Sequence, residues 1–152
     1  MTTHLLDVNV LVALLWPAHQ AHAAAQAWLA RVPARKWATC PLTQAGVVRI
    51  LSNPAFSPHA VSPWQALDVL TANLAHSRHV FWPDEISLSE ALQPFRSTLT
   101  GHRQITDAYL LALAVHHKGR LATFDRAILP LSGRGFAPKH CVDLLVTRAR
   151  SV

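Results

Sequence analysis

Short apolar segments alternate with longer segments of helical periodicity along most of the chain. We expect five buried strands, at residues 3–6, 37–40, 79–82, 121–124 and 141–146. The intervening segments have apolar residues at helical spacing, and we expect helices over 9–16, 18–31, 41–51, 63–76, 87–98 and 106–117. Strands that alternate with helices in this way form a parallel sheet with both faces covered. The pattern therefore predicts the α/β class.

Residues that favour helix ends set several of these boundaries. Ser62 followed by Pro63 is typical of an N-cap and a first helical turn. Pro17 and Gly119 end the helices that precede them, and Pro94 is a position for a kink. A chain of 152 residues has the size of one domain with its own core, and we expect a single domain over residues 1–152.

Asp7 stands inside the apolar run 5–15, where a carboxylate is costly unless it is paired, hydrated or bound to a cation. Asp107 and Asp125 also stand at the edges of apolar runs, in a chain with only eight Asp and Glu residues. Asp7 and Asp125 each follow a predicted strand, and Asp107 opens a predicted helix. Since ligands of open parallel sheets bind beyond the carboxyl ends of the strands, we expect the three acids to converge there.

Converging carboxylates repel one another, and a divalent cation removes that repulsion. Oxygen ligands favour Mg²⁺ or Mn²⁺, and such an ion can activate water for attack on a phosphodiester. Each acid alone also has a simpler explanation. Asp107 could be a favourable charge in a first helical turn, and Asp125 could be a cap or turn residue. The metal hypothesis therefore depends on the three acids together.

The chain is basic, with a formal net charge of +6, and most of its cations are Arg. Arg favours bidentate contact with phosphate, so the charge favours a nucleic-acid partner, although a basic surface also serves solubility alone. Arg103 and Arg126 are the cations nearest in sequence to the acids, and they are candidates for holding phosphates.

The sequence also indicates a compartment. No apolar stretch approaches the roughly 18 residues that span a bilayer, and the N-terminus lacks the features of a signal peptide. Cys40 and Cys141 lie in strand-like apolar segments, where buried free thiols are favoured over a disulfide. We therefore expect a cytoplasmic protein with no membrane partner.

Three segments resemble the PIN-domain ribonucleases, and in particular the VapC toxins of bacterial type II toxin–antitoxin systems. They are Leu6–Leu11, Ile105–Ala114 and Leu121–Arg126, and the likeness extends to Thr39–Gln44 and Phe81–Asp84. The resemblance implies a PIN-like three-layer sandwich with a central parallel sheet flanked by helices. It also implies a Mg²⁺- or Mn²⁺-dependent endoribonuclease that acts as a toxin on RNA, is blocked by a cognate antitoxin and forms a homodimer.

By position, Asp7, Asp107 and Asp125 match the catalytic, metal-binding acids of that family. The neighbouring residues Asn9, Thr106 and Thr123 are candidates for orienting waters or carboxylates.

Gln44 departs from the family pattern, because many members carry a Glu at this place. An amide can orient water or donate to phosphate, but it supplies no negative charge. The site then has three acids where four are common, which favours one tightly held ion over two. The alternative is a PIN-like module that has lost cleavage and binds RNA or a partner protein. A phosphoaspartyl enzyme with Asp7 as nucleophile is disfavoured, because Asn9 replaces the second acid of such sites.

Several other residues have structural explanations. His19 and His22 could hold Zn²⁺ but lack a third ligand of matching spacing, and the adjacent His116 and His117 are expected at surface or core positions. Most of the five Trp residues are expected in the core, and Asp143 in a structural role. An apolar helix face, formed by Val61, Trp64, Leu67 and Leu70, suits either core burial or an antitoxin groove.

Overall fold

The computed structural model describes residues 2–132 and 141–147 and contains all five predicted strands. They are β1 (His4–Leu6), β2 (Trp37–Thr39), β3 (His79–Phe81), β4 (Arg120–Thr123) and β5 (Val142–Leu144). The strands form a sheet in the order β3-β2-β1-β4-β5, and every neighbouring pair is parallel. The prediction of a central parallel sheet is confirmed.

Helices connect the strands and cover both faces of the sheet. They are α1 (Val8–Leu15), α2 (His22–Ala30), α3 (Pro41–Leu51), α4 (Pro63–Leu74), α5 (Leu88–Leu92) and α6 (Ile105–His116). Short 3₁₀ turns are η1 (Gln93–Phe95), η2 (His102–Gln104) and η3 (Arg126–Ile128). Among the described residues, no helix has both the length and the apolar character needed to cross a membrane.

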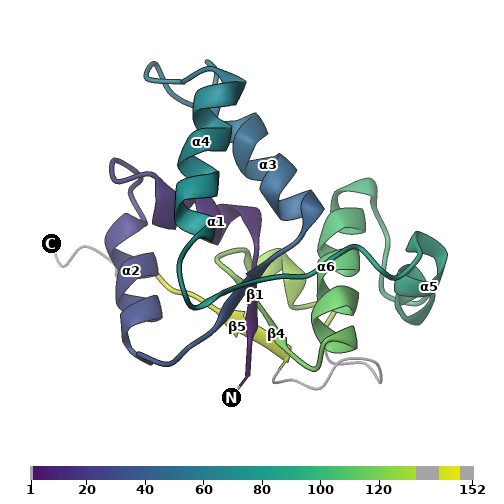
Figure 1. Ribbon diagram of the computed structural model, residues 1–152. Coiled ribbons are helices and arrows are strands. Elements are labelled where there is room, and N and C mark those ends of the chain that lie inside the picture. Colours follow the sequence, from purple (N-terminus) through teal and green to yellow (C-terminus); the bar gives the residue numbers. More distant parts are fainter. Residues whose placement is uncertain (1, 133–140, 148–152) are drawn as a thin grey trace, which may run out of the picture.

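Side-chain alternation along β1 divides the core into two layers. Leu5 packs with the apolar residues of α5 and α6, whereas Leu6 packs with those of α1, α2, α3 and α4. Figure 1 shows α5 and α6 together on one side of the sheet, with α2 across from them. The arrangement is the predicted three-layer sandwich, and it puts the start of α6 over the same sheet edge as the end of β1.

Two helix boundaries differ from the prediction. The helix α2 begins at His22 and not at Ala18, because the preceding residues form turns in which the Ala21 amide donates to His19 Nδ1. The helix predicted over 87–98 ends at Leu92 and continues as the 3₁₀ turn η1, since Pro94 has no amide hydrogen to donate. The predicted N-cap of α4 is confirmed, because Ser62 Oγ accepts from the Gln65 amide at 3.2 Å.

The expectation that most of the Trp residues lie in the core is confirmed, because Trp28, Trp37 and Trp82 are buried. Trp64 is the exception at 76% exposed, so core burial does not explain its place on the apolar helix face. The face that α4 buries contains Ala66 and Leu70, and Trp64 lies outside it. Cys40 and Cys141 are buried free thiols, as predicted.

Candidate active site

Asp7 sits at the end of β1 and begins the helix α1. Its Oδ1 atom accepts a hydrogen bond from the Val8 amide at 2.7 Å, so the side chain is the N-cap of α1. Its own amide donates to Ala122 of β4 at 2.9 Å. Gly46 of α3 lets the first turn of α1 pack closely, since a Cβ there would lie 2.6 Å from a Val8 methyl group. The Asp7 carboxylate is therefore fixed by strand, helix and packing together.

Two neutral side chains hold the second oxygen of Asp7. Thr123 Oγ1 donates to Asp7 Oδ2 at 2.7 Å, and Asn9 Nδ2 donates to the same atom at 3.2 Å. Thr123 Oγ1 also accepts from the Asp125 amide at 3.0 Å, and Asn9 Oδ1 accepts from the Phe124 amide at 3.1 Å. This network joins the carboxyl ends of β1 and β4, and it places Asn9 and Thr123 in contact with Asp7.

Asp107 and Asp125 reach the same edge from two other elements. Asp107 is half-buried in the first turn of α6, and Asp125 is exposed directly after β4. Asp125 Oδ1 accepts from the Ala127 amide at 2.8 Å and so caps η3. The simpler explanations of these two acids, as a first-turn charge and a cap, are therefore both compatible with their positions.

The three acids lie close enough to perturb one another electrostatically. Burial raises the pKa of Asp107 to about 6, with further contributions from the charges of Asp7 and Asp125. Burial also raises the pKa of Asp7, where the hydrogen bonds from Thr123 and Val8 oppose it and the charge of Asp125 adds to it. Within residues 2–132 and 141–147, none of the three acids forms an ion pair with a cation. They form a centre of uncompensated negative charge in a basic chain.

The acids are not drawn together as tightly as the ligands of a closed metal site. In the described part of the chain, the group with one ligand atom each within 4.8 Å is Glu85, His116 and His117, away from the acids. A wider acid cluster suits Mg²⁺, which usually keeps several waters and binds protein through one or two carboxylates.

The other residues predicted for the site lie in several different elements. Thr106 is exposed beside Asp107, and Arg103 is exposed in η2. Arg126 is exposed in η3 and lines a surface pocket together with Asn9. Gln44 Nε2 donates to Thr39 Oγ1 at 2.9 Å and contacts none of the acids through a hydrogen bond.

Two polar clusters were missed by sequence reasoning. One joins Glu85 to the adjacent His116 and His117. The other joins Asp143 of β5 to His4 and Arg35, which fits the structural role expected for Asp143. The pair His116 and His117 is visible in the sequence, but its partner Glu85 lies in a separate element, as do the partners of Asp143, so neither full cluster has a local sequence signal.

Comparison with known proteins identifies the family. The PIN domain family matches residues 4–131. Ribonuclease VapC39 of Mycobacterium tuberculosis H37Rv is 44% identical over 133 residues, which are 88% of this chain and 96% of that protein. Ribonuclease VapC44 of the same strain is 44% identical over 141 residues, which are 92% of this chain and 98% of that protein.

Solved structures share the fold at low sequence identity. The VapBC2 structure from Rickettsia felis, bound to a DNA fragment of its promoter, aligns with a TM-score of 0.62 and 13% identity over 95% of this chain and 99% of that chain. Mycobacterium tuberculosis VapC20, a toxin that cleaves the Sarcin-Ricin loop, aligns with a TM-score of 0.60 and 15% identity over 89% and 99%.

The family match and the identity to curated relatives both extend over most of the chain. They agree with the parallel sheet and with the three motifs on which the resemblance was based. The chain therefore belongs to the PIN domain family and, within it, to the VapC ribonucleases.

Proposed function

We propose that this protein is the toxic component of a type II toxin–antitoxin system, an endoribonuclease that hydrolyses RNA phosphodiester bonds. The observation that carries the proposal is the uncompensated negative centre at the sheet edge. Asp7 is buried and held only by neutral donors, and the charges of Asp107 and Asp125 act on it or on each other. In a basic protein, such a centre can bind a cation, and that cation can contact a polyanionic substrate.

The residues present fit Mg²⁺ or Mn²⁺. Carboxylate and hydroxyl oxygens are hard ligands. Burial, with a smaller contribution from the neighbouring acids, raises the pKa values of Asp7 and Asp107, and a divalent ion would favour their charged forms. Asp7, Asp107 and Asp125 would hold the ion. When bound, the ion supplies an activated water and neutralises charge on the phosphodiester.

The chain's own side chains orient this centre. Thr123 and Asn9 fix the rotamer of Asp7 through their hydrogen bonds to Oδ2. Arg126, which lines the pocket beside Asn9, is placed to hold an RNA phosphate, and Arg103 is a second candidate on η2. We assign Thr106 a lesser role in orienting water beside Asp107.

The partners follow from the same proposal. We propose an RNA substrate, a cognate antitoxin that blocks cleavage, a homodimeric toxin and a cytoplasmic location. We also propose that the one PIN domain extends over residues 1–152. The parallel pairing of β5 with β4 supports this extent, because β5 lies beyond the matched residues 4–131.

The test is RNA cleavage by purified protein with and without divalent ions. We expect cleavage with Mg²⁺ or Mn²⁺, none after chelation, and a loss of at least about 100-fold in Asp7→Asn and Asp107→Asn, because metal stabilisation of such transition states amounts to several kcal/mol. Asp68→Asn, at an exposed acid of α4, is the matched control and should cleave normally. Unchanged activity in either site variant would contradict the assignment.

A second candidate is a PIN module that binds RNA or protein without cutting. One observation favours it: Gln44, which supplies no negative charge, donates to Thr39 and forms no hydrogen bond to any of the three acids within the described residues. The same experiment separates the candidates. RNA binding that persists without cleavage, together with undetectable Mg²⁺ or Mn²⁺ binding by calorimetry, would favour the binding module.

A further inference from the structure

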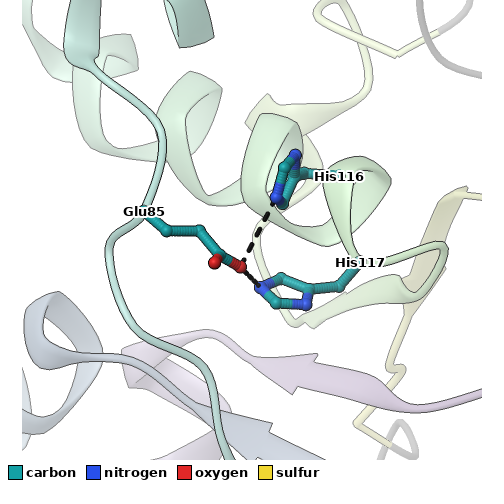
Figure 2. A group of neighbouring side chains, drawn as sticks. All are labelled: Glu85, His116 and His117. Atoms are coloured by element: carbon teal, nitrogen blue, oxygen red, sulfur yellow. Dashed lines mark ion pairs between the residues drawn. The ribbon is translucent and has the colours of Figure 1, made fainter.

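A second cluster of metal-ligating side chains lies at the other end of α6 from Asp107. His116 is the last residue of α6 and His117 is its C-cap, while Glu85 belongs to the segment between β3 and α5. Figure 2 shows the Glu85 carboxylate beside both imidazole rings. From Asp107 to His117 the helix rises about 15 Å at 1.5 Å per residue, so this cluster is separate from the three acids.

Distances within the cluster match those between ligands of one metal ion. His116 Nε2 lies 3.4 Å from Glu85 Oε1, and His117 Nε2 lies 2.8 Å from the same oxygen. Two ligands of a tetrahedral Zn²⁺, each about 2.0–2.1 Å from the ion, are about 3.3 Å apart. The His116 contact already has this length, and the His117 contact would have to lengthen by about half an ångström.

The contact between His117 and Glu85 is close but poorly directed. His117 Nε2 is buried, and among the described residues it has no hydrogen-bond partner although Glu85 Oε1 is 2.8 Å away. An imidazole that simply donated to a carboxylate would point its N–H at the oxygen. Two atoms that are near each other but not aimed at each other are what ligands of a shared ion show.

The surroundings hold the His117 ring in place. It stacks on the buried Trp82 with a centroid distance of 4.3 Å and an interplanar angle of 10°. Gly119 permits this approach, because a Cβ at that position would lie 2.6 Å from the Trp82 ring. A ring held in one orientation suits a metal ligand.

Helix geometry explains why the two adjacent histidines can act together. Neighbouring residues within a helix point in different directions. Here α6 ends at His116, and the backbone of His117 has φ −83° and ψ 8°, outside the helix. The two rings therefore meet edge to face, with centroids 5.2 Å apart. The His116 and Glu85 side chains are 46% and 42% exposed, which leaves a path for an ion and room for a water ligand.

We propose that Glu85, His116 and His117 form a binding site for a divalent transition-metal ion of the Zn²⁺ type. Two imidazoles and one carboxylate are a donor set that suits Zn²⁺ and is too rich in nitrogen for Mg²⁺. The ion would join the end of α6 to the segment after β3, two elements that are otherwise linked here by side-chain contacts. It would stabilise the fold by binding the native state and not the unfolded chain.

The test is direct Zn²⁺ binding to tag-free, chelator-treated protein, measured by competition with a chromogenic zinc chelator. We expect one equivalent of tightly bound Zn²⁺ in the wild type, and affinity lowered about tenfold or more in both His116→Gln and Glu85→Gln. These two positions are half-exposed, so their variants should fold. His117→Gln is less suitable, because it also removes the stack on Trp82.

Two controls separate this site from other ligands of the chain. His59→Gln changes an exposed histidine between α3 and α4, and Asp107→Asn changes the acid centre, so both should bind Zn²⁺ like the wild type. Zinc should also raise the melting temperature of the wild type and of both controls, but not of His116→Gln. Wild-type affinity in Glu85→Gln or His116→Gln, or loss of binding in Asp107→Asn, would overturn the proposal.

Discussion

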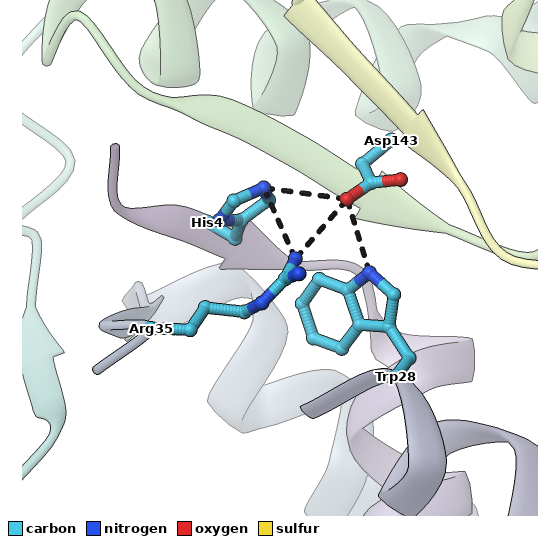
Figure 3. Close-up of polar contacts among 4 residues, drawn as sticks. All are labelled: His4, Trp28, Arg35 and Asp143. Carbon is cyan, nitrogen blue, oxygen red and sulfur yellow. Dashed lines mark hydrogen bonds and ion pairs between the residues drawn. The ribbon is translucent and has the colours of Figure 1, made fainter. Parts of the chain in front are cut away.

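Asp107 and Asp143 are the same residue type at similar depth, yet their surroundings have opposite effects. Asp143 accepts from Trp28 Nε1 at 3.0 Å and pairs with Arg35 and His4 at 3.2 and 3.3 Å (Figure 3). The hydrogen bond from His4, followed by that from Trp28 and by the positive charges, holds the pKa of Asp143 far below its usual range, against burial. Asp107 forms no ion pair with a cation of the described residues, and burial raises its pKa to about 6.

The difference separates an acid that stabilises the fold from one that we propose binds a cation. The negative charge of Asp143 is compensated within the fold by Arg35. The buried Arg35 guanidinium also lies over the Trp28 ring, 4.2 Å from its centroid. This network joins β5, β1 and α2 into one unit. The acid centre lacks such compensation and therefore strains the metal-free fold, which an external cation can relieve.

The largest expected effect is the loss of stability when the charge of Asp143 is removed. Asp143→Asn leaves Arg35 buried without its carboxylate, and we expect the free energy of unfolding to fall by about 3 kcal/mol, the lower end of the range for broken buried pairs. Urea denaturation at neutral pH measures this loss. The matched control is Asp68→Asn on the exposed face of α4, which should stay within about 0.5 kcal/mol of the wild type.

The sign of the pH dependence at Asp143 follows from its lowered pKa. The carboxylate contributes stability above about pH 4, the usual value of an unfolded Asp, and that contribution is lost as the pH falls further. In Asp143→Asn this part of the fall in stability below about pH 4 should be absent. A variant as stable as the wild type at pH 7 would mean that the network is not a structural tie.

Mg²⁺ should act on the acid centre and not on the network around Asp143. At Mg²⁺ about 100-fold above its dissociation constant, an ion that binds only the folded state stabilises it by about 2.7 kcal/mol. We expect this rise in wild type and in Glu85→Gln, and none in Asp107→Asn, measured by thermal and urea unfolding. A rise that persists in Asp107→Asn would place the ion elsewhere.

Most of the fold could be predicted from the sequence, because strands and helices each have a local pattern of apolar residues. Each short apolar segment predicted one strand, and the alternation with helices predicted parallel pairing, as found. The start of α2 was missed because an Ala-rich stretch has the same helix propensity whether or not a turn precedes it. The exposure of Trp64 was missed because the spacing of apolar residues does not say which of them face the core.

For the polar sites, the sequence was informative only where an acid interrupted an apolar run. Asp7 was recognised in this way, and Asn9 was then a candidate because it lies two positions from Asp7. The partners of Asp143 could not be found, because Arg35 lies 108 positions away along the chain. Glu85 and His116 likewise meet only after α6 packs beside the segment that follows β3.

Replacing an acid of the uncompensated centre should stabilise the metal-free protein. The raised pKa of Asp107 means that its contribution to stability falls as the pH rises from about 4 through about 6. Asp107→Asn removes this dependence, and at pH 7 we expect a gain of about 1–2 kcal/mol, after allowance for solvent screening at a half-buried site. Urea unfolding of chelator-treated protein at pH 5 and pH 7 tests this. If Asp107→Asn and the wild type had equal free energies of unfolding at pH 7, or if these free energies changed equally with pH, the charge of Asp107 would not destabilise the fold. Asp107 would then not differ from Asp143 in the way described.

The smallest effect concerns the neutral donors that fix Asp7. Thr123→Val removes the 2.7 Å hydrogen bond to Oδ2 with little change in shape, and one such bond is worth about 1 kcal/mol. We expect RNA cleavage to fall about fivefold, while Thr123→Ser, which keeps the hydroxyl, retains wild-type cleavage. The unfolding free energy of both variants, measured with chelator, distinguishes a positioning role from a packing role. If Thr123→Ser, which keeps the hydroxyl, lost as much activity as Thr123→Val, the hydrogen bond alone would not account for the conformation of Asp7. The acid centre would then depend on packing around β4 as well as on a polar network, in contrast to the ion pairs that hold Asp143.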